Sequence, residues 1–125
     1  MPYSIEMEDD VVHVRLTGRL TGLDLQKLCA EAVNYERQPV IPHRITDMRA
    51  VTEVAVHYPE IAAMAEKRRG IPFPHRFKSA IIADNPHHLV YARMFQTLND
   101  NPHIAIRIFP DEPSASRWID HRETR

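Results

Sequence analysis

Alternating apolar and polar positions mark the beginning of the chain. In residues 11–17, valine and leucine alternate with histidine and arginine, and this period of two predicts a half-buried β-strand. Residues 3–7 form a shorter strand segment, and Asp9 and Asp10 supply turn residues between the two. We therefore expect an antiparallel hairpin at the start of the fold.

After residue 20 the apolar spacing changes to that of a helix. Thr21 is a typical N-cap, and Asp24 three positions later makes an acidic variant of the capping box. Apolar residues then occupy one helical face at i, i+3, i+4 and i+7, namely Leu25, Leu28, Cys29 and Ala32. We interpret Cys29 as a small buried apolar residue and not a nucleophile, because no charged partner beside it would lower its pKa.

Strands and helices alternate through the rest of the chain. Residues 44–48 predict a short strand ending at Asp47, and the nearly continuous apolar run 77–83 predicts a strand covered on both faces. A second helix has Pro59 in its first turn and ends at Gly70 and Pro72, and a third begins at Asn85 and Pro86. A last strand over 104–109 and a last helix over 111–121 complete the chain. The order β-β-α-β-α-β-α-β-α predicts one α/β domain over residues 1–125, with a mixed, mostly parallel five-stranded sheet and about four helices.

Composition narrows the class of protein. The 125 residues are 43% apolar and 26% charged, as in a globular domain. No apolar stretch approaches the roughly 20 residues of a membrane span, and the N-terminus lacks a secretory h-region. A single cysteine suits a reducing cytoplasm, and a net charge of −1 gives no global attraction to nucleic acid. We therefore expect a cytoplasmic protein without a membrane span or a nucleic-acid partner.

Four segments resemble one known family: DMRAV at 47–51, FKSAIIAD at 77–84, YARMF at 91–95 and IRIFPDEPSASRWI at 106–119. They are similar to the SpoIIAA-like proteins, small bacterial domains related to the STAS domains of anti-sigma-factor antagonists, with a more distant fold likeness to CRAL-TRIO lipid carriers. The resemblance implies a SpoIIAA/STAS-like fold and a regulatory or protein-interaction role. It also implies a phosphorylatable serine at the start of the second helix, but residues 55–57 read Ala-Val-His and Thr52 is too early. We therefore do not expect the phosphoserine switch.

Two predicted strand ends carry carboxylates. Asp47 and Asp84 stand where ligands of open α/β sheets bind, so they could hold Mg²⁺ or act as a general base; alternatively, each holds backbone N–H groups of the following loop. His87 and His88 are interpreted as polar helix-start residues facing a groove, with His88 one turn after Asp84. They do not predict a metal site, because no two histidines are spaced i, i+4.

The segment from Val51 to Tyr58 is apolar and β-branched, and we interpret it as buried loop or an early helical turn. With Phe73 nearby, it predicts either a docking patch for a protein or the mouth of a small hydrophobic cleft. In the second case the cleft is lined by Val54, Tyr58, Phe73, Tyr91 and Met94. Glu53 and His57 would make a base and its orienting partner only in a helix, and we expect them in loop.

Two sets of basic residues each have two interpretations. Arg93 is a surface or ion-paired residue, or an arm that reaches an anionic ligand or a partner subunit. The cluster at the end of the second helix and in the following loop is solvated charge that completes the helix C-terminus, or an anion patch; it comprises Lys67, Arg68, Arg69, Arg76 and Lys78.

The sequence contains no complete catalytic or cofactor motif. Its three glycines exclude a dinucleotide fingerprint and a P-loop, and no Ser or Cys lies in a Gly-rich elbow. We therefore expect no catalysis and no cofactor. We expect a regulatory domain that binds a protein partner or itself as a homodimer, or alternatively a domain that binds a small apolar or anionic ligand. The candidate ligand or partner site comprises Asp47, Arg49, Val54, His57, Tyr58, Phe73, Asp84, His87, His88, Tyr91 and Arg93.

Overall fold

Five strands form a single sheet in the computed structural model, which describes residues 2–121. The strands are β1 (Tyr3–Glu8), β2 (Val11–Thr21), β3 (His43–Ala55), β4 (Phe77–Ile82) and β5 (Ile104–Phe109). They lie side by side in chain order; β1 pairs antiparallel with β2, and the remaining pairs are parallel. The predicted element order, opening hairpin and mixed five-stranded sheet are confirmed.

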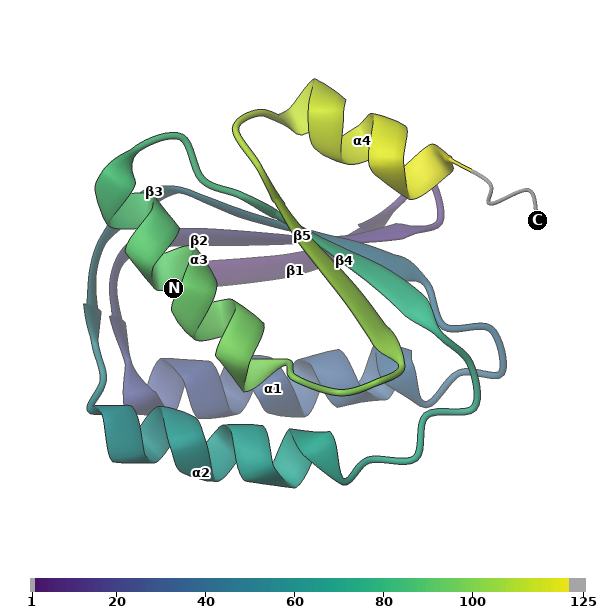
Figure 1. Cartoon of the computed structure of the whole chain (residues 1–125), viewed down its shortest axis with the longest axis horizontal. Helices are drawn as coiled ribbons and strands as arrows, with labels where there is room; N and C mark the ends of the chain where they lie inside the picture. The colour runs from purple at the N-terminus through teal and green to yellow at the C-terminus, as the bar shows by residue number, and fades with distance from the viewer. Residues whose placement is uncertain (1, 122–125) are drawn as a thin grey trace.

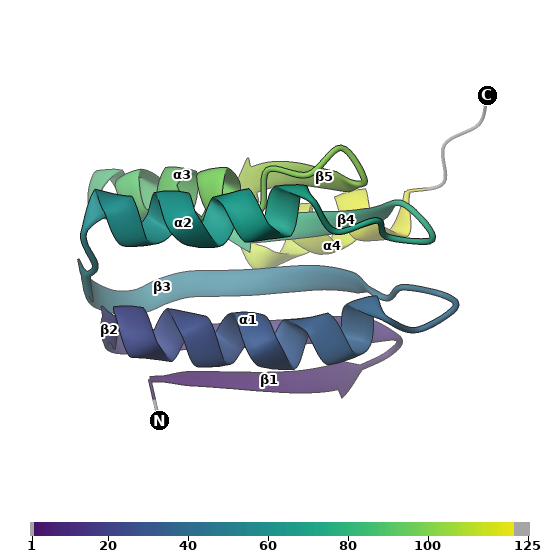
Figure 2. The same cartoon turned by 90° about the horizontal axis from the view of Figure 1, so that it is seen from below.

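Four helices cover the two faces of the sheet unequally. They are α1 (Gly22–Glu36), α2 (Tyr58–Arg69), α3 (Pro86–Leu98) and α4 (Glu112–Asp120). The first three share one apolar core with one face of the sheet, and α4 lies alone on the opposite face over β4 and its neighbours (Figure 1, Figure 2). No helix of the described residues is both long and apolar enough to cross a membrane.

The strand β3 extends to Ala55, seven residues beyond the predicted range 44–48. Its second half, Val51–Ala55, pairs with the second half of β2, so the prediction of loop or an early helical turn for these residues is wrong. The β-branched residues favour strand, and a partner strand was available because β2 also continues past its predicted end. Glu53 is therefore a strand residue, and its Oε1 lies 3.4 Å from Nε of Arg19 on β2.

Both long strands accommodate an irregularity near their middle. The register between β2 and β3 shifts on either side of Gly18, whose φ is +66°. Such a backbone conformation strains any residue with a Cβ, so glycine suits it. Beyond this bulge the strands lead directly into α1 and α2, which places the starts of these two helices beside each other.

Side-chain caps fix the starts of three helices. The Asp24 backbone N–H donates to Thr21 Oγ1 at 3.2 Å, and Thr21 N–H donates to Asp24 Oδ2 at 2.9 Å, which confirms the predicted capping box. At α3 and α4 only the side chain of the cap accepts a bond: Asn85 Oδ1 accepts the His88 N–H at 2.9 Å, and Asp111 Oδ1 accepts the Ser114 N–H at 2.8 Å. These caps satisfy amide groups that have no partner within the helix.

Candidate functional site

Asp47 lies level with the carboxyl end of β4, although it is not the end of its own strand. Pairing between β3 and β4 stops at Asp47 and Ile82, while β3 continues. The Asp47 carboxylate accepts three hydrogen bonds from Arg49: from Nε at 3.0 Å, from Nη2 at 2.8 Å and from the backbone N–H at 3.0 Å. Burial alone would raise the pKa of Asp47, but these bonds outweigh it and hold that pKa below its usual value. This arrangement agrees with the structural interpretation of Asp47.

Asp84 and His88 meet at the start of α3. His88 Nδ1 lies 3.0 Å from Asp84 Oδ1, which is the pairing that their spacing predicts. His88 Nε2 lies 3.0 Å from the carbonyl oxygen of Val51, and the His88 ring is buried. His87 is exposed on the same turn. The buried histidine thus ties α3 to β3, and the prediction that His88 faces a groove is wrong. No group of three potential metal ligands occurs among residues 2–121.

Exposed apolar side chains gather where β2 and β3 lead into their helices. Tyr58 at the start of α2 is 72% exposed, and Leu23 at the start of α1 is 60% exposed. The two helix starts are close, because a Cβ added at Gly22 would collide with the Glu60 carboxylate. We call the surface formed by Leu23, Val54, His57 and Tyr58 the α1–α2 rim. It lies where both strands turn down into α1 and α2 (Figure 1).

The residues of the predicted hydrophobic cleft come together only in part. Val54, Tyr91 and Met94 pack against the main core, but Phe73 and Tyr58 lie apart. Phe73 follows the C-terminal end of α2 and is buried with Ile41, Phe77 and Ile104, whereas Tyr58 begins the same helix. A helix of this length spans about 18 Å, so grouping Phe73 with Tyr58 in one cleft is wrong. Tyr91 is half-buried against the main core, and Arg93 is exposed with no ion pair among the described residues.

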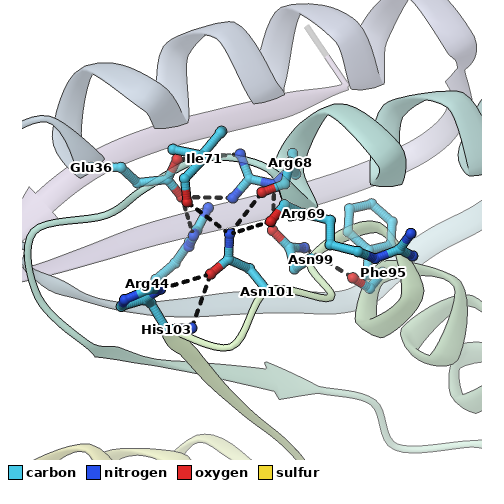
Figure 3. Close-up of polar contacts among 9 residues, drawn as sticks. All are labelled: Glu36, Arg44, Arg68, Arg69, Ile71, Phe95, Asn99, Asn101 and His103. Atoms are coloured by element: carbon cyan, nitrogen blue, oxygen red, sulfur yellow. Dashed lines mark hydrogen bonds and ion pairs between the residues drawn. The ribbon is translucent and has the colours of Figure 1, made fainter.

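A buried ion triad is the main feature that the sequence analysis missed (Figure 3). Glu36 Oε2 accepts hydrogen bonds from Arg44 Nη2 and Arg68 Nη2, each at 2.7 Å, and Glu36 Oε1 accepts one from Arg68 Nη1 at 3.2 Å. Burial alone would raise the pKa of Glu36, but the two guanidinium groups outweigh it and lower that pKa. Arg68 is therefore not the solvated charge predicted for its cluster. Its place on the stripe of Ile61 and Ala65 was the available signal.

Two more predictions about charge need correction. Lys78 donates to the carbonyl oxygens of Trp118 at 2.8 Å and His121 at 2.7 Å, so it caps the end of α4.

Cys29 is half-buried and has charged neighbours. Burial raises the pKa of its thiol, and the positive charges of Arg68 and Arg44 offset this only in part. The prediction that no charged partner lies beside Cys29 is therefore wrong, and the raised pKa disfavours the thiolate form.

An open groove runs between α1 and α2. Its volume is about 630 Å³, within the range of small-molecule sites. The walls are mainly apolar, contributed by Cys29, Ala30, Val33, Ala63, Met64 and Ile71. This groove lies on the helical face and not at the carboxyl edge of the sheet where the sequence analysis placed a cleft.

Comparison with known proteins identifies the fold. No model of a known protein family matches the sequence, and no curated protein matches it. A similar solved structure is an uncharacterized protein from the DUF3478 family with a SpoIIAA-like fold, from Shewanella loihica PV-4. The two share 18% identity and a TM-score of 0.58, over 94% of this chain and 91% of that chain. The predicted SpoIIAA-like fold is confirmed; at this identity the likeness concerns the fold alone.

Proposed function

We propose that this protein is a non-catalytic interaction domain that binds a protein partner through the α1–α2 rim. The observation that carries this proposal is the exposure of Tyr58 and Leu23 at adjacent helix starts. Large apolar side chains held in water on a rigid element are typical of interfaces. Tyrosine in particular supplies contact area and a hydrogen-bonding group at low entropic cost, and it is enriched among interface hot spots.

The surroundings of the rim favour a partner with matching polar groups. Arg19 and Glu53 form an exposed ion pair on the strands behind the rim, at 3.4 Å, and Glu60 follows Tyr58 on α2. A polar border around an apolar centre is the usual anatomy of an interface. Ala55, Val56 and His57 stand where a switch serine would be, so we propose that binding does not depend on phosphoserine at this position.

A site-specific photo-cross-linker tests the proposal. The cross-linking amino acid is placed at position 58 or 23 in the full chain, and irradiation is carried out in the native host cell. The control carries it at position 40: Val40 is 78% exposed and lies beyond the other end of α1. We expect a discrete adduct from positions 58 and 23 that is absent from position 40.

The mass of the adduct distinguishes the two kinds of protein partner. An adduct of twice the chain mass means self-association, and any other mass means a different protein. Equal adduct patterns from all three positions, or no adduct from position 58, would refute the proposed role of the rim.

The groove between α1 and α2 supports a second candidate function, the binding of a small apolar ligand. Its volume and mainly apolar walls are the favouring observations. Native mass spectrometry after gentle purification would detect a bound molecule, and replacement of Ala63 by Trp would displace it. An unliganded protein, together with no thermal shift across a panel of lipids and metabolites, would exclude this function.

A further inference from the structure

The ion triad leaves an unbalanced positive charge inside the protein. Glu36, Arg44 and Arg68 are 3%, 9% and 4% exposed, and two guanidinium groups face one carboxylate. Arginine stays protonated at neutral pH even when burial lowers its pKa. The group therefore carries a net charge of +1 in a region of low dielectric, where an uncompensated charge is costly.

Hydrogen bonding within the triad is also incomplete. Arg68 uses all three side-chain nitrogens, because its Nε donates to Asn99 Oδ1 at 3.0 Å (Figure 3). Among the described residues, Arg44 finds a side-chain acceptor only through Nη2, and its guanidinium lies over the Phe77 ring at 5.4 Å. No fully buried side-chain nitrogen in residues 2–121 lacks a partner. The remaining N–H groups of Arg44 therefore face space that a solvent atom can enter.

A small cavity has Arg44 and Arg68 in its wall. Its volume is about 20 Å³. Half of its wall is apolar, and the other half consists of Arg44, Arg68, Thr46, Ser79, Asn99 and Cys29. No carboxylate lines it. A second cavity beside Arg44, of about 10 Å³, differs because Glu36 forms part of its wall. Of the two, the larger cavity has both arginines and no carboxylate in its wall.

The size and chemistry of the cavity define its occupant. A single water-sized atom requires about 10–15 Å³ of such space, so phosphate, sulfate and carboxylates are too large. Water could accept a hydrogen bond from Arg44, but it would leave the net charge unchanged. We propose that the cavity binds one monoatomic anion of chloride size beside Arg44 and Arg68. The hydroxyl groups of Thr46 and Ser79 complete its shell.

Crystals grown in bromide test the position of the anion. Anomalous diffraction at the bromine edge should show a peak within hydrogen-bond distance of Arg44 and of the Thr46 hydroxyl. A peak only at the protein surface, with water or nothing in the cavity, would overturn the proposal.

Thermal unfolding tests the same anion in solution. The melting temperature is followed as chloride replaces gluconate at constant ionic strength. Once chloride exceeds its dissociation constant, each tenfold increase should raise the melting temperature by roughly 5 °C. An equal melting temperature in both salts would overturn the proposal.

A cavity-filling variant separates this site from general salt effects. Ser79→Val replaces the hydroxyl and adds a methyl group, which occupies the cavity while suiting a strand. It should remove the chloride dependence, whereas Thr52→Val, at an exposed position of the same sheet, should retain it. Full chloride dependence in folded Ser79→Val would overturn the assignment, and the bromide experiment decides the matter if that variant does not fold.

Discussion

Replacing Glu36 by Gln should destabilise the protein more than any surface substitution. The change keeps the shape of the side chain and removes the carboxylate that contacts both Arg44 and Arg68. Removing one partner of a buried ion pair typically costs about 3–5 kcal/mol, which is a large part of the 5–15 kcal/mol that stabilises an ordinary domain. For 125 residues, a loss of this size lowers the melting temperature by roughly 10–20 °C.

Urea unfolding followed by circular dichroism measures this loss. The midpoint should fall with an unchanged m-value, since the surface exposed on unfolding is the same. The matched control is Glu66→Gln, which removes an exposed carboxylate 3.3 Å from Arg69 and should change stability by less than about 1 kcal/mol. A Glu36→Gln variant within 1 kcal/mol of the wild type would refute the reasoning, because it would mean that the guanidinium groups need no counter-charge.

The same variant has a defined pH signature. Because the pKa of Glu36 is lowered in the folded state from its usual value near 4.5, its contribution is fully present above that value and is lost as the pH falls through the folded-state pKa. The difference between wild type and Glu36→Gln should therefore be constant near neutral pH and shrink below about pH 4.5. A difference that persists unchanged at lower pH would contradict this assignment.

Three further predictions concern individual elements. Thr21→Ala should cost about 1 kcal/mol in urea unfolding, because the capping box of α1 is lost. His88→Leu should cost about 1–3 kcal/mol in the same assay, because the Val51 carbonyl loses its donor. In hydrogen exchange followed by mass spectrometry, α2 should exchange faster than α3, since its buried residues include only two apolar side chains; equal protection of the two helices would contradict this.

Local patterns were sufficient to predict the order of elements. The alternation in β2, the stripe of α1 and the apolar run of β4 each depend on residues close together in the chain, and the structure places them as expected. The end of β3 was missed even though the β-branched residues from Val51 onward favour strand. What extends this strand is a partner in β2, and pairing between distant segments leaves little trace in either sequence alone.

The candidate site was predictable only where its contacts are local. Asp84 and His88 are one helical turn apart, so their pairing follows from spacing. Phe73 and Tyr58 are close enough in sequence to suggest a shared cleft, yet the length of α2 separates them. The triad joins three elements across 32 positions of chain, and a buried arginine looks in sequence like any surface arginine until its partner is known.

The ion triad attaches α2 to the rest of the fold, a role that apolar packing fills for the neighbouring helices. Before the charged residue of the triad, the buried stripe of α1 carries Leu25, Leu28 and Ala32, whereas that of α2 carries only Ile61 and Ala65. Apolar contacts tolerate rotation of a helix, but the paired bonds from Arg68 to Glu36 are directional and accept one orientation. Ten residues separate Arg68 from Tyr58, which corresponds to about 80° around the helix at 3.6 residues per turn. The charge that holds one end of α2 therefore also fixes which side chain its other end presents at the α1–α2 rim, and an apolar residue at position 68 would keep the helix attached without fixing that direction.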